Sequence, residues 1–171
     1  MADLFQTSGA TISACGQYRY HLWRVWCEEA PIMCFVMQNP STANADDDDP
    51  TIRRCIGFAE REGFGGISVR NVFALRATDE RELLTHPDPY GPDNDDHLLA
   101  VRQCSLMTRL VVAWGNEFGG KRLRRHYAKA KNILASQGPV YCLGTTKSGA
   151  PWHPLFLRAD TELVHWKIPG S

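Results

Sequence analysis

Three apolar segments of this chain each end in a short polar motif, and this pattern restricts the folds that the chain can adopt. The segments and the residues that follow them are 31–37 with Gln38, 67–70 with Asn71, and 139–143 with a loop that ends in His153. In open α/β sheets, ligands bind at the carboxyl ends of parallel strands. The three motifs are therefore expected to meet in one crevice, which favours a small-molecule or nucleobase site.

The composition indicates one globular domain with no overall charge preference. The chain has 171 residues, of which 43% are hydrophobic, and its 19 basic and 19 acidic residues cancel. This apolar content suffices for one substantial core, and the balanced charge favours neither nucleic acid nor a membrane surface as partner. Because no apolar run approaches the roughly 20 residues that span a bilayer, we expect a single cytoplasmic domain over residues 1–171, a monomer that does not contact membranes.

The spacing of the cysteines does not indicate a metal or redox site. No two of them are separated by only two residues, as they are in zinc ribbons and redox motifs. Several lie inside apolar runs, which is typical of buried thiols. Spacing alone leaves an iron–sulfur cluster as an alternative, but we expect neither a metal nor a cofactor. The cysteines are Cys15, Cys27, Cys34, Cys55, Cys104 and Cys142.

Apolar runs alternate with segments of helical spacing along most of the chain. Residues 10–26 are rich in β-branched and aromatic side chains, which is typical of an antiparallel hairpin at a sheet edge. Strands are predicted at 32–37, 67–73, 110–114 and 140–143, and helices at 51–63, 78–84, 93–107 and 120–137. This alternation predicts an α/β fold, a three-layer α/β/α sandwich whose mainly parallel central sheet has about four strands.

The first polar motif is QNPST, residues 38–42. The proline holds Asn39 in an extended conformation, which would direct its amide into the crevice. The alternative is a turn in which Asn39, Ser41 and Thr42 bond only to nearby backbone groups. Taken alone, the motif favours the turn.

Asn71 and His153 close the other two motifs. An unsatisfied buried carboxamide costs roughly 1–3 kcal/mol, so the Asn71 side chain is expected to find its partner in either a ligand or a neighbouring loop. His153 lies in a loop containing glycine and proline, together with Lys147 and Trp152. A histidine there suits donation to a leaving group because its pKa is near neutrality, and the other histidines are expected to be at the surface or structural.

Two runs of like charge have ordinary explanations as well as functional ones. The acidic run 46–49 lacks the alternating spacing of a calcium loop, and we expect Asp49 to cap the helix that follows. Residues 121–131 carry six Lys or Arg residues. They form either a solvated helix face or, if the protein binds a polyanion, the surface that meets its phosphates, with Arg122, Arg124 and Arg125 as contacts.

Together, these motifs resemble two families. The string NPSTANADDDDPTIRRC, with RNVFALRATD, GPDND, VVAWG and LGTTKSGAPWHPL, is similar to DUF1643, a bacterial family of unknown function, over most of residues 30–157. More distantly, the chain resembles the uracil-DNA glycosylase superfamily. In that comparison MQNPS stands for GQDPYH or GINPG, Asn71 in SVRN stands for the base-reading Asn, and HPLF stands for HPSP. Ser41 replaces the aromatic residue of GQDPYH, and Leu155 and Phe156 replace the phosphate-contacting SP.

The glycosylase resemblance implies a nucleobase N-glycosylase that takes a damaged, mismatched or modified nucleotide out of its stack. It implies that Asn39 orients the attacking water and that His153 stabilises the departing base. Recognition of the base would fall to Gln38 and Asn71, with stacking on Phe64 or Trp152. The substrate would be DNA or a free nucleotide or nucleoside. The phosphates of DNA or of a nucleotide would meet Ser41, Thr42, Lys147 and the basic helix.

Two other functions remain open from the residues. The first is a nucleotide-binding or sensor domain that uses the same Asn pair and His153 without catalysis. The second is a hydrolase of another glycosidic or phosphate ester bond, which would need a carboxylate in the crevice such as Asp46 or Asp79. The sequence alone does not distinguish these functions from the glycosylase.

Overall fold

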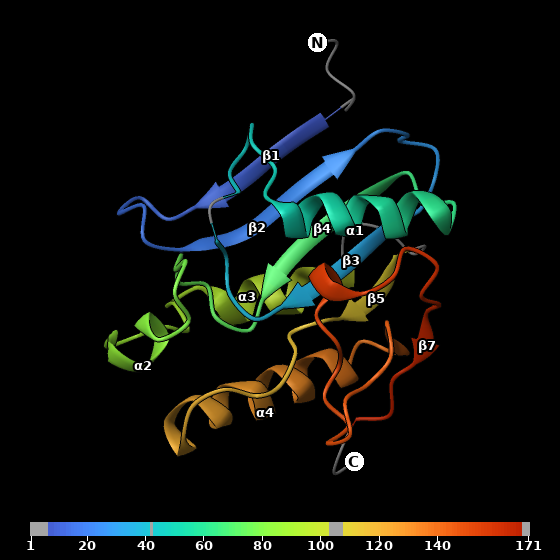
Figure 1. Ribbon diagram of the computed structural model, residues 1–171. Coiled ribbons are helices and arrows are strands. Elements are labelled where there is room, and N and C mark those ends of the chain that lie inside the picture. The colour runs from blue at the N-terminus through green and yellow to red at the C-terminus, as the bar shows by residue number, and fades with distance from the viewer. Residues whose placement is uncertain (1–6, 42, 103–107, 169–171) are drawn as a thin grey trace.

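The strands of the protein form one mixed sheet (Figure 1). The computed structural model describes residues 7–41, 43–102 and 108–168. The strands in these ranges are β1 (Thr7–Ile12), β2 (Arg19–Val25), β3 (Ile32–Met37), β4 (Gly66–Asn71), β5 (Arg109–Val112), β6 (Val140–Cys142) and β7 (Val164–His165). Their order across the sheet is β1-β2-β4-β3-β5-β6-β7.

The β3 strand lies in the middle of the sheet because its side chains are apolar on both faces. Residues 33–37 are at most 5% exposed, and a strand covered on both sides needs such a continuous apolar run. β3 pairs in parallel with β4 and with β5, and β5 pairs in parallel with β6. The four strands therefore end at the same edge of the sheet.

The prediction of a mainly parallel sheet of about four strands is wrong. Three of the six strand pairings in the described part of the chain are antiparallel: β1 with β2, β2 with β4, and β6 with β7. The N-terminal hairpin extends the sheet beyond β4, and the chain after residue 160 folds back as β7 along β6. Both additions cover edges that would otherwise present unpaired backbone groups. The fold remains α/β, but the sheet is mixed and has seven strands in the described ranges.

Helices cover both faces of this sheet, with α1 on one face and α3 and α4 on the other (Figure 1). The helices are α1 (Pro50–Arg61), α2 (Glu82–Thr85), α3 (Asn94–Leu99) and α4 (Lys121–Ala135), with 3₁₀ turns η1 (Ala100–Arg102) and η2 (Pro154–Phe156). The helix predicted at 93–107 is shorter than expected, because α3 passes into η1 at Ala100. The last part of that prediction, 103–107, lies outside the described residues.

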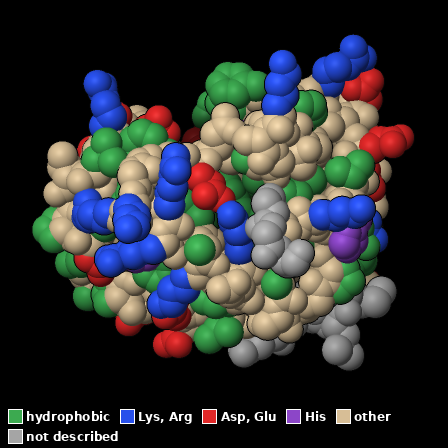
Figure 2. Space-filling model, turned by 90° about the horizontal axis from the view of Figure 1, so that it is seen from below, with side chains coloured by type: hydrophobic (Ala, Val, Ile, Leu, Met, Phe, Trp, Pro, Cys, Tyr) green, Lys and Arg blue, Asp and Glu red, His purple; other side chains and the backbone are tan. Residues whose placement is uncertain are grey.

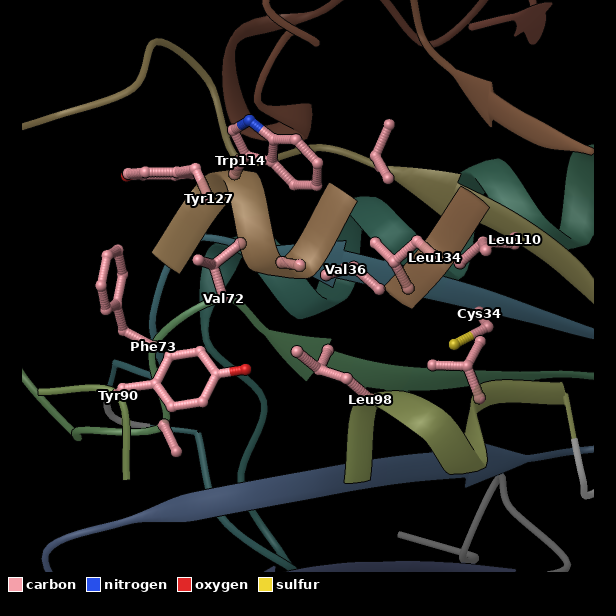
Figure 3. Packing of buried hydrophobic residues seen from close by; sticks show 14 of the residues in the cluster. Cys34, Val36, Val72, Phe73, Tyr90, Leu98, Leu110, Trp114, Tyr127 and Leu134 are labelled. Carbon is pink, nitrogen blue, oxygen red and sulfur yellow. The ribbon is translucent and has the colours of Figure 1, made fainter. Parts of the chain in front are cut away.

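Two apolar clusters hold the helices to the sheet. On the α3 and α4 face, Val36 and Leu110 pack with Leu98 of α3 and Leu134 of α4 (Figure 3). Opposite them, Phe35, Met37 and Ile67 belong to the cluster that includes Ile52 and Phe58 of α1. The alternation of β3 side chains between the two clusters follows from the two-residue period of a strand. Three cysteines, Cys34, Cys55 and Cys142, are buried in these clusters, as expected.

His21 on β2 is an uncharged histidine held by a short polar chain. Its Nε2 atom lies 2.8 Å from Ser68 Oγ, which accepts a hydrogen bond of 2.6 Å from Arg70. The Ser68 hydroxyl is thereby free to donate its proton to the neutral ring. Burial, with a smaller contribution from the charge of Arg70, lowers the pKa of His21 from 6.5 to about 3.

We predict that His21 makes the folded protein sensitive to mild acid. Below about pH 6.5 His21 is protonated in the unfolded state, whereas in the folded state it stays neutral down to about pH 3. The free energy of unfolding therefore falls as the pH drops through this window. Between pH 7 and pH 5 the unmodified protein should lose about 2 kcal/mol more unfolding free energy than His21→Gln. Urea unfolding at the two pH values measures this difference, and equal losses in both proteins would contradict a buried neutral His21.

Candidate functional site

A cavity of about 690 Å³ opens where the parallel strands end. It brings together Gln38, Asn39 and Ser41 from the segment after β3 with His153 from the loop after β6. These residues are far apart in sequence, and the cavity size is within the range of small-molecule sites. The predicted meeting of the first and third polar motifs is thus confirmed by the structure.

Asn39 is held by two hydrogen bonds from its amide nitrogen. Its Nδ2 atom donates to the carbonyl oxygens of Pro40 at 3.1 Å and Ala77 at 2.8 Å. The Ala77 amide in turn donates to the Pro40 carbonyl at 3.0 Å, which ties the segment after β3 to the segment after β4. Because Nδ2 is engaged, the side chain has one orientation, and within the described ranges Oδ1 accepts no hydrogen bond. Part of the turn interpretation is therefore correct, since Asn39 does bond to backbone.

Gln38 is fixed at both ends of its amide. Its Oε1 atom accepts a hydrogen bond of 2.9 Å from the Tyr127 hydroxyl of α4, and its Nε2 atom donates to Glu80 at 3.1 Å. The Tyr127 oxygen accepts a longer bond of 3.4 Å from the Phe118 amide. Burial raises the pKa of Tyr127, so the hydroxyl keeps its proton and remains a donor to Gln38.

One glycine and two prolines position the loop that contains His153. Gly115, which follows β5, has φ of +79°, a conformation that L side chains rarely adopt. Its amide donates to the Pro151 carbonyl at 2.9 Å, which holds the loop containing His153 against the end of β5. Pro154 then begins η2 and keeps His153 extended, with ψ of 137°.

The His153 ring is neutral and has a defined tautomer. Its Nδ1 atom accepts a hydrogen bond of 3.3 Å from the Leu155 amide, so the neutral ring carries its proton on Nε2. Burial lowers the pKa of His153, and the charge of Asp49 opposes that shift without cancelling it. His153 is therefore an uncharged N–H donor at neutral pH.

Two charged residues of the cavity were not predicted as site residues. Arg19, the first residue of β2, lines the cavity although it is only 2% exposed. Asp49 also lines it, and its Oδ1 atom accepts a hydrogen bond of 2.9 Å from the Ile52 amide, which confirms the predicted helix cap. No sequence pattern indicated Arg19 as a site residue, because an arginine in a strand usually extends to solvent. Aromatic walls come from Trp114, Phe118 and Phe156.

Asn71 does not line the cavity, contrary to prediction. It is 1% exposed, and it lies beside Met37 in the parallel register of β3 and β4. Met37 lines the cavity and Asn71 lies one strand behind it. Neither Nδ2 nor Oδ1 of Asn71 has a hydrogen-bond partner among the residues that the structure describes, so the predicted base reader is a buried carboxamide outside the cavity wall.

The remaining predicted contacts also lie outside the cavity. Phe64 is buried in the cluster beneath α1, where the Arg109 guanidinium lies over its ring. Trp152 is 42% exposed and packs near Gly144, whereas Lys147 is exposed on the same loop. None of these side chains lines the cavity. Thr42 lies outside the described residues.

The basic residues of α4 differ in how they are used. Arg122 donates to the carbonyls of Leu84, His86 and Pro87 and so holds the α2 segment. Lys129 pairs with Asp95, and Lys131 pairs with Glu117. Lys and Arg side chains gather on the face seen from below, where α4 lies (Figure 2). Apart from Arg122, the exposed basic residues of α4 with no ion pair to a described residue are Lys121, Arg124 and Arg125.

The residues of the acidic run 46–49 form local hydrogen bonds and an ion pair. Asp46 and Asp47 donate backbone hydrogen bonds to the Asn44 side chain, and Asp48 forms an ion pair of 2.9 Å with Arg24. Asp46 and Asp79, proposed as alternative catalytic carboxylates, do not line the cavity. Across 7–41, 43–102 and 108–168, no group of three or more His, Cys, Asp or Glu residues is arranged to hold a metal ion.

Comparison with known proteins gives a family but no activity. A family model described as "Protein of unknown function (DUF1643)" matches residues 19–155, and the chain belongs to this family. The matched range begins at Arg19 and includes His153, so it contains the cavity residues described above except Phe156. No curated protein and no solved structure matches the chain. Among the described helices, none is long and apolar enough to cross a membrane.

We predict that Asn39→Asp destabilises the protein although it changes only one atom of the side chain. A carboxylate cannot donate to the carbonyls of Pro40 and Ala77, and it would place negative charge beside them. The expected loss is about 1–3 kcal/mol of unfolding free energy, measured by urea titration.

Asn116→Asp is the matched control for this prediction. Asn116 lies on the same cavity, but its Oδ1 atom accepts a bond of 3.4 Å from Ser148, a role that a carboxylate retains. A loss in Asn116→Asp as large as that in Asn39→Asp would show that the two Asn39 donor bonds do not stabilise the fold.

Proposed function

We propose that the protein is a hydrolase of N-glycosidic bonds that acts on a nucleotide or on a nucleotide within DNA. The observation that carries the proposal is the presence of Asn39 and His153 on one cavity, each with its orientation set by hydrogen bonds. In the sequence resemblance to uracil-DNA glycosylases, the same pair corresponds to the water-activating and base-stabilising residues. Asn39 would supply an acceptor and His153 a neutral donor for this reaction.

In the proposed reaction, the oxygen of a water molecule bonds to the C1′ atom of the sugar as the bond from C1′ to the base nitrogen breaks. The electron pair of that bond leaves with the base, which becomes an anion. Asn39 Oδ1 accepts a hydrogen bond from the water and orients it. His153 Nε2–H donates to the base anion, a contribution that grows as the charge develops.

Asp49 completes this set as the carboxylate of the cavity. One of its oxygen atoms is used by the Ile52 amide, and the other is available to the cavity. We assign it to accept the proton of the water and to stabilise positive charge on the sugar in the transition state. The Trp114, Phe118 and Phe156 rings provide apolar surface for a base.

A second candidate is a nucleotide-binding domain without catalysis. It is favoured by the position of Asn71, because a glycosylase of the proposed type would read its base with that residue, and Asn71 lies behind Met37 instead. Both candidates use the same cavity. They differ in whether bound nucleotide loses its base.

The direct test is release of a base from defined substrates. Purified protein is incubated with oligonucleotides and free nucleotides that carry uracil, hypoxanthine, mismatched thymine or hypermodified bases, and abasic sites and free base are quantified. Base release that is lost in Asp49→Asn supports the hydrolase, because asparagine keeps the helix cap but not the carboxylate. Binding without release from any substrate would support the non-catalytic domain.

We predict that His153→Ala lowers turnover much more than affinity. The Nε2–H contact is strongest when the base carries its charge, so its loss should reduce the single-turnover rate about 10²–10³-fold. Substrate affinity should change only a few-fold. His165→Ala, a histidine on β7 outside the cavity, is the control and should retain the rate. Equal losses of affinity and rate in His153→Ala would contradict the proposed role.

We predict that α4 contributes to affinity only if the substrate is nucleic acid. Arg124→Glu should weaken oligonucleotide binding for all sequences and should flatten its dependence on salt, because one phosphate contact releases about one counterion. The control is Lys167→Glu, which makes the same change of charge as Arg124→Glu. Lys167 lies near Val140, at the amino end of the parallel strands. Fluorescence anisotropy at several salt concentrations measures both. If the two variants bind alike, the exposed face of α4 does not meet the phosphates.

A further inference from the structure

Arg19 is a buried cation with unused hydrogen-bonding capacity. The residue is 2% exposed and lines the cavity. Its Nη1 atom donates to the Ala43 carbonyl, but within residues 7–41, 43–102 and 108–168 the buried Nε atom has no acceptor. Nor does any carboxylate of the described residues lie within ion-pair distance of its guanidinium. A buried charge without a partner is costly, so this arrangement indicates a site that an anion completes.

The charges around Arg19 favour the same conclusion. Among the charges that act on its pKa, Asp49 has the largest effect and raises it, whereas Arg76 and Arg24 lower it. Burial lowers the pKa of Arg19 to about 10, which still leaves it charged at neutral pH. The other carboxylates on the cavity are occupied, because Glu80 accepts from Gln38 and Glu117 pairs with Lys131.

A second cavity of about 570 Å³ adjoins the first at Ser41, Ala77 and Thr78. Arg76 lines this second cavity, and its buried Nε atom also has no hydrogen-bond partner among the described residues. Ser41 and Thr78 thus line both cavities, with Arg19 on the first cavity and Arg76 on the second. Two guanidinium groups and two hydroxyl groups form a set of donors that suits the oxygens of a phosphate.

We infer that the two cavities form one site for a phosphorylated ligand, with the phosphate at their junction between Arg19 and Arg76. The inference rests on the proposed function for the nucleoside part of the ligand, which would occupy the cavity of Asn39 and His153. It names the substrate class as one in which a phosphate lies beside the base and sugar being processed. That phosphate is either the 5′-phosphate of a free nucleotide or a phosphodiester of nucleic acid.

The test is equilibrium binding to the intact protein by calorimetry. The probes are inorganic phosphate, a panel of deoxynucleosides, their 5′-monophosphates, and single-stranded oligonucleotides without a 5′-phosphate. We expect inorganic phosphate to bind and to compete with the monophosphates, which should bind at least about tenfold more tightly than the nucleosides. Tight binding of monophosphates alone identifies a free nucleotide, whereas binding of the oligonucleotides identifies a phosphodiester.

Single substitutions test whether Arg19 and Arg76 bind the phosphate specifically, rather than through the overall charge of the protein. Arg19→Gln and Arg76→Gln should each weaken monophosphate binding at least about tenfold and leave nucleoside binding unchanged. Lys167→Gln removes the same charge near the amino end of β6 and should bind as the unmodified protein does. Arg76→Gln keeps the test valid if thermal melting shows that Arg19→Gln does not fold, because Arg76 is only partly buried.

Two results would overturn the inference: an unmodified protein that binds neither inorganic phosphate nor any phosphorylated probe, or arginine variants that bind the monophosphates unchanged. Base release is scored separately on the same samples. Phosphate binding without base release would contradict the proposed hydrolase and would still support the phosphate site. Base release that is equally efficient in Arg19→Gln and Arg76→Gln removes the phosphate site and leaves the hydrolase.

Discussion

The parallel pairing of β3 with both β4 and β5 is the constraint on which the rest of the structure depends. It brings the ends of three strands to one edge, and backbone hydrogen bonds of 2.8 Å from Val72 to Met37 and from Ala113 to Val36 continue the pairing past the strand ends. Beyond these bonds the segments separate. The cavity lies in the space between them, as expected where strands of a parallel sheet diverge toward their connections.

Some buried polar groups of this protein donate hydrogen bonds that hold the chain together, whereas Arg19 reaches the cavity. Arg24 is held by Asp48 and by the Asn44 carbonyl, and Asn94 donates to the carbonyls of Asn71 and Val72. These groups connect loops and helices to the sheet. Arg19 differs because it reaches the cavity with an Nε atom that has no hydrogen-bond partner in the described part of the chain. Since buried polar groups are usually satisfied, such an exception beside a cavity is the strongest local indication of a ligand.

Much of the chain could be predicted from local patterns, because those patterns report local physics. The apolar run 32–37 indicated a strand covered on both faces, and Asp49-Pro50 indicated the start of α1; the structure has both. The sheet was predicted less well, since β7 has two residues and is too short to show an alternating pattern. Its pairing depends on the neighbouring edge of β6, which is a tertiary property.

The sequence by itself determined that the polar motifs follow buried strands, and for Asn39 and His153 this was enough, because parallel strands share an edge. Only the tertiary structure decided which neighbouring side chains reach the cavity. The register of β3 and β4 placed Met37 on the cavity wall and Asn71 behind it. The antiparallel entry of β2 brought Arg19, from the other end of the chain, to the same edge. Register and strand direction are set by packing across the whole sheet, so they cannot be predicted from a local sequence motif.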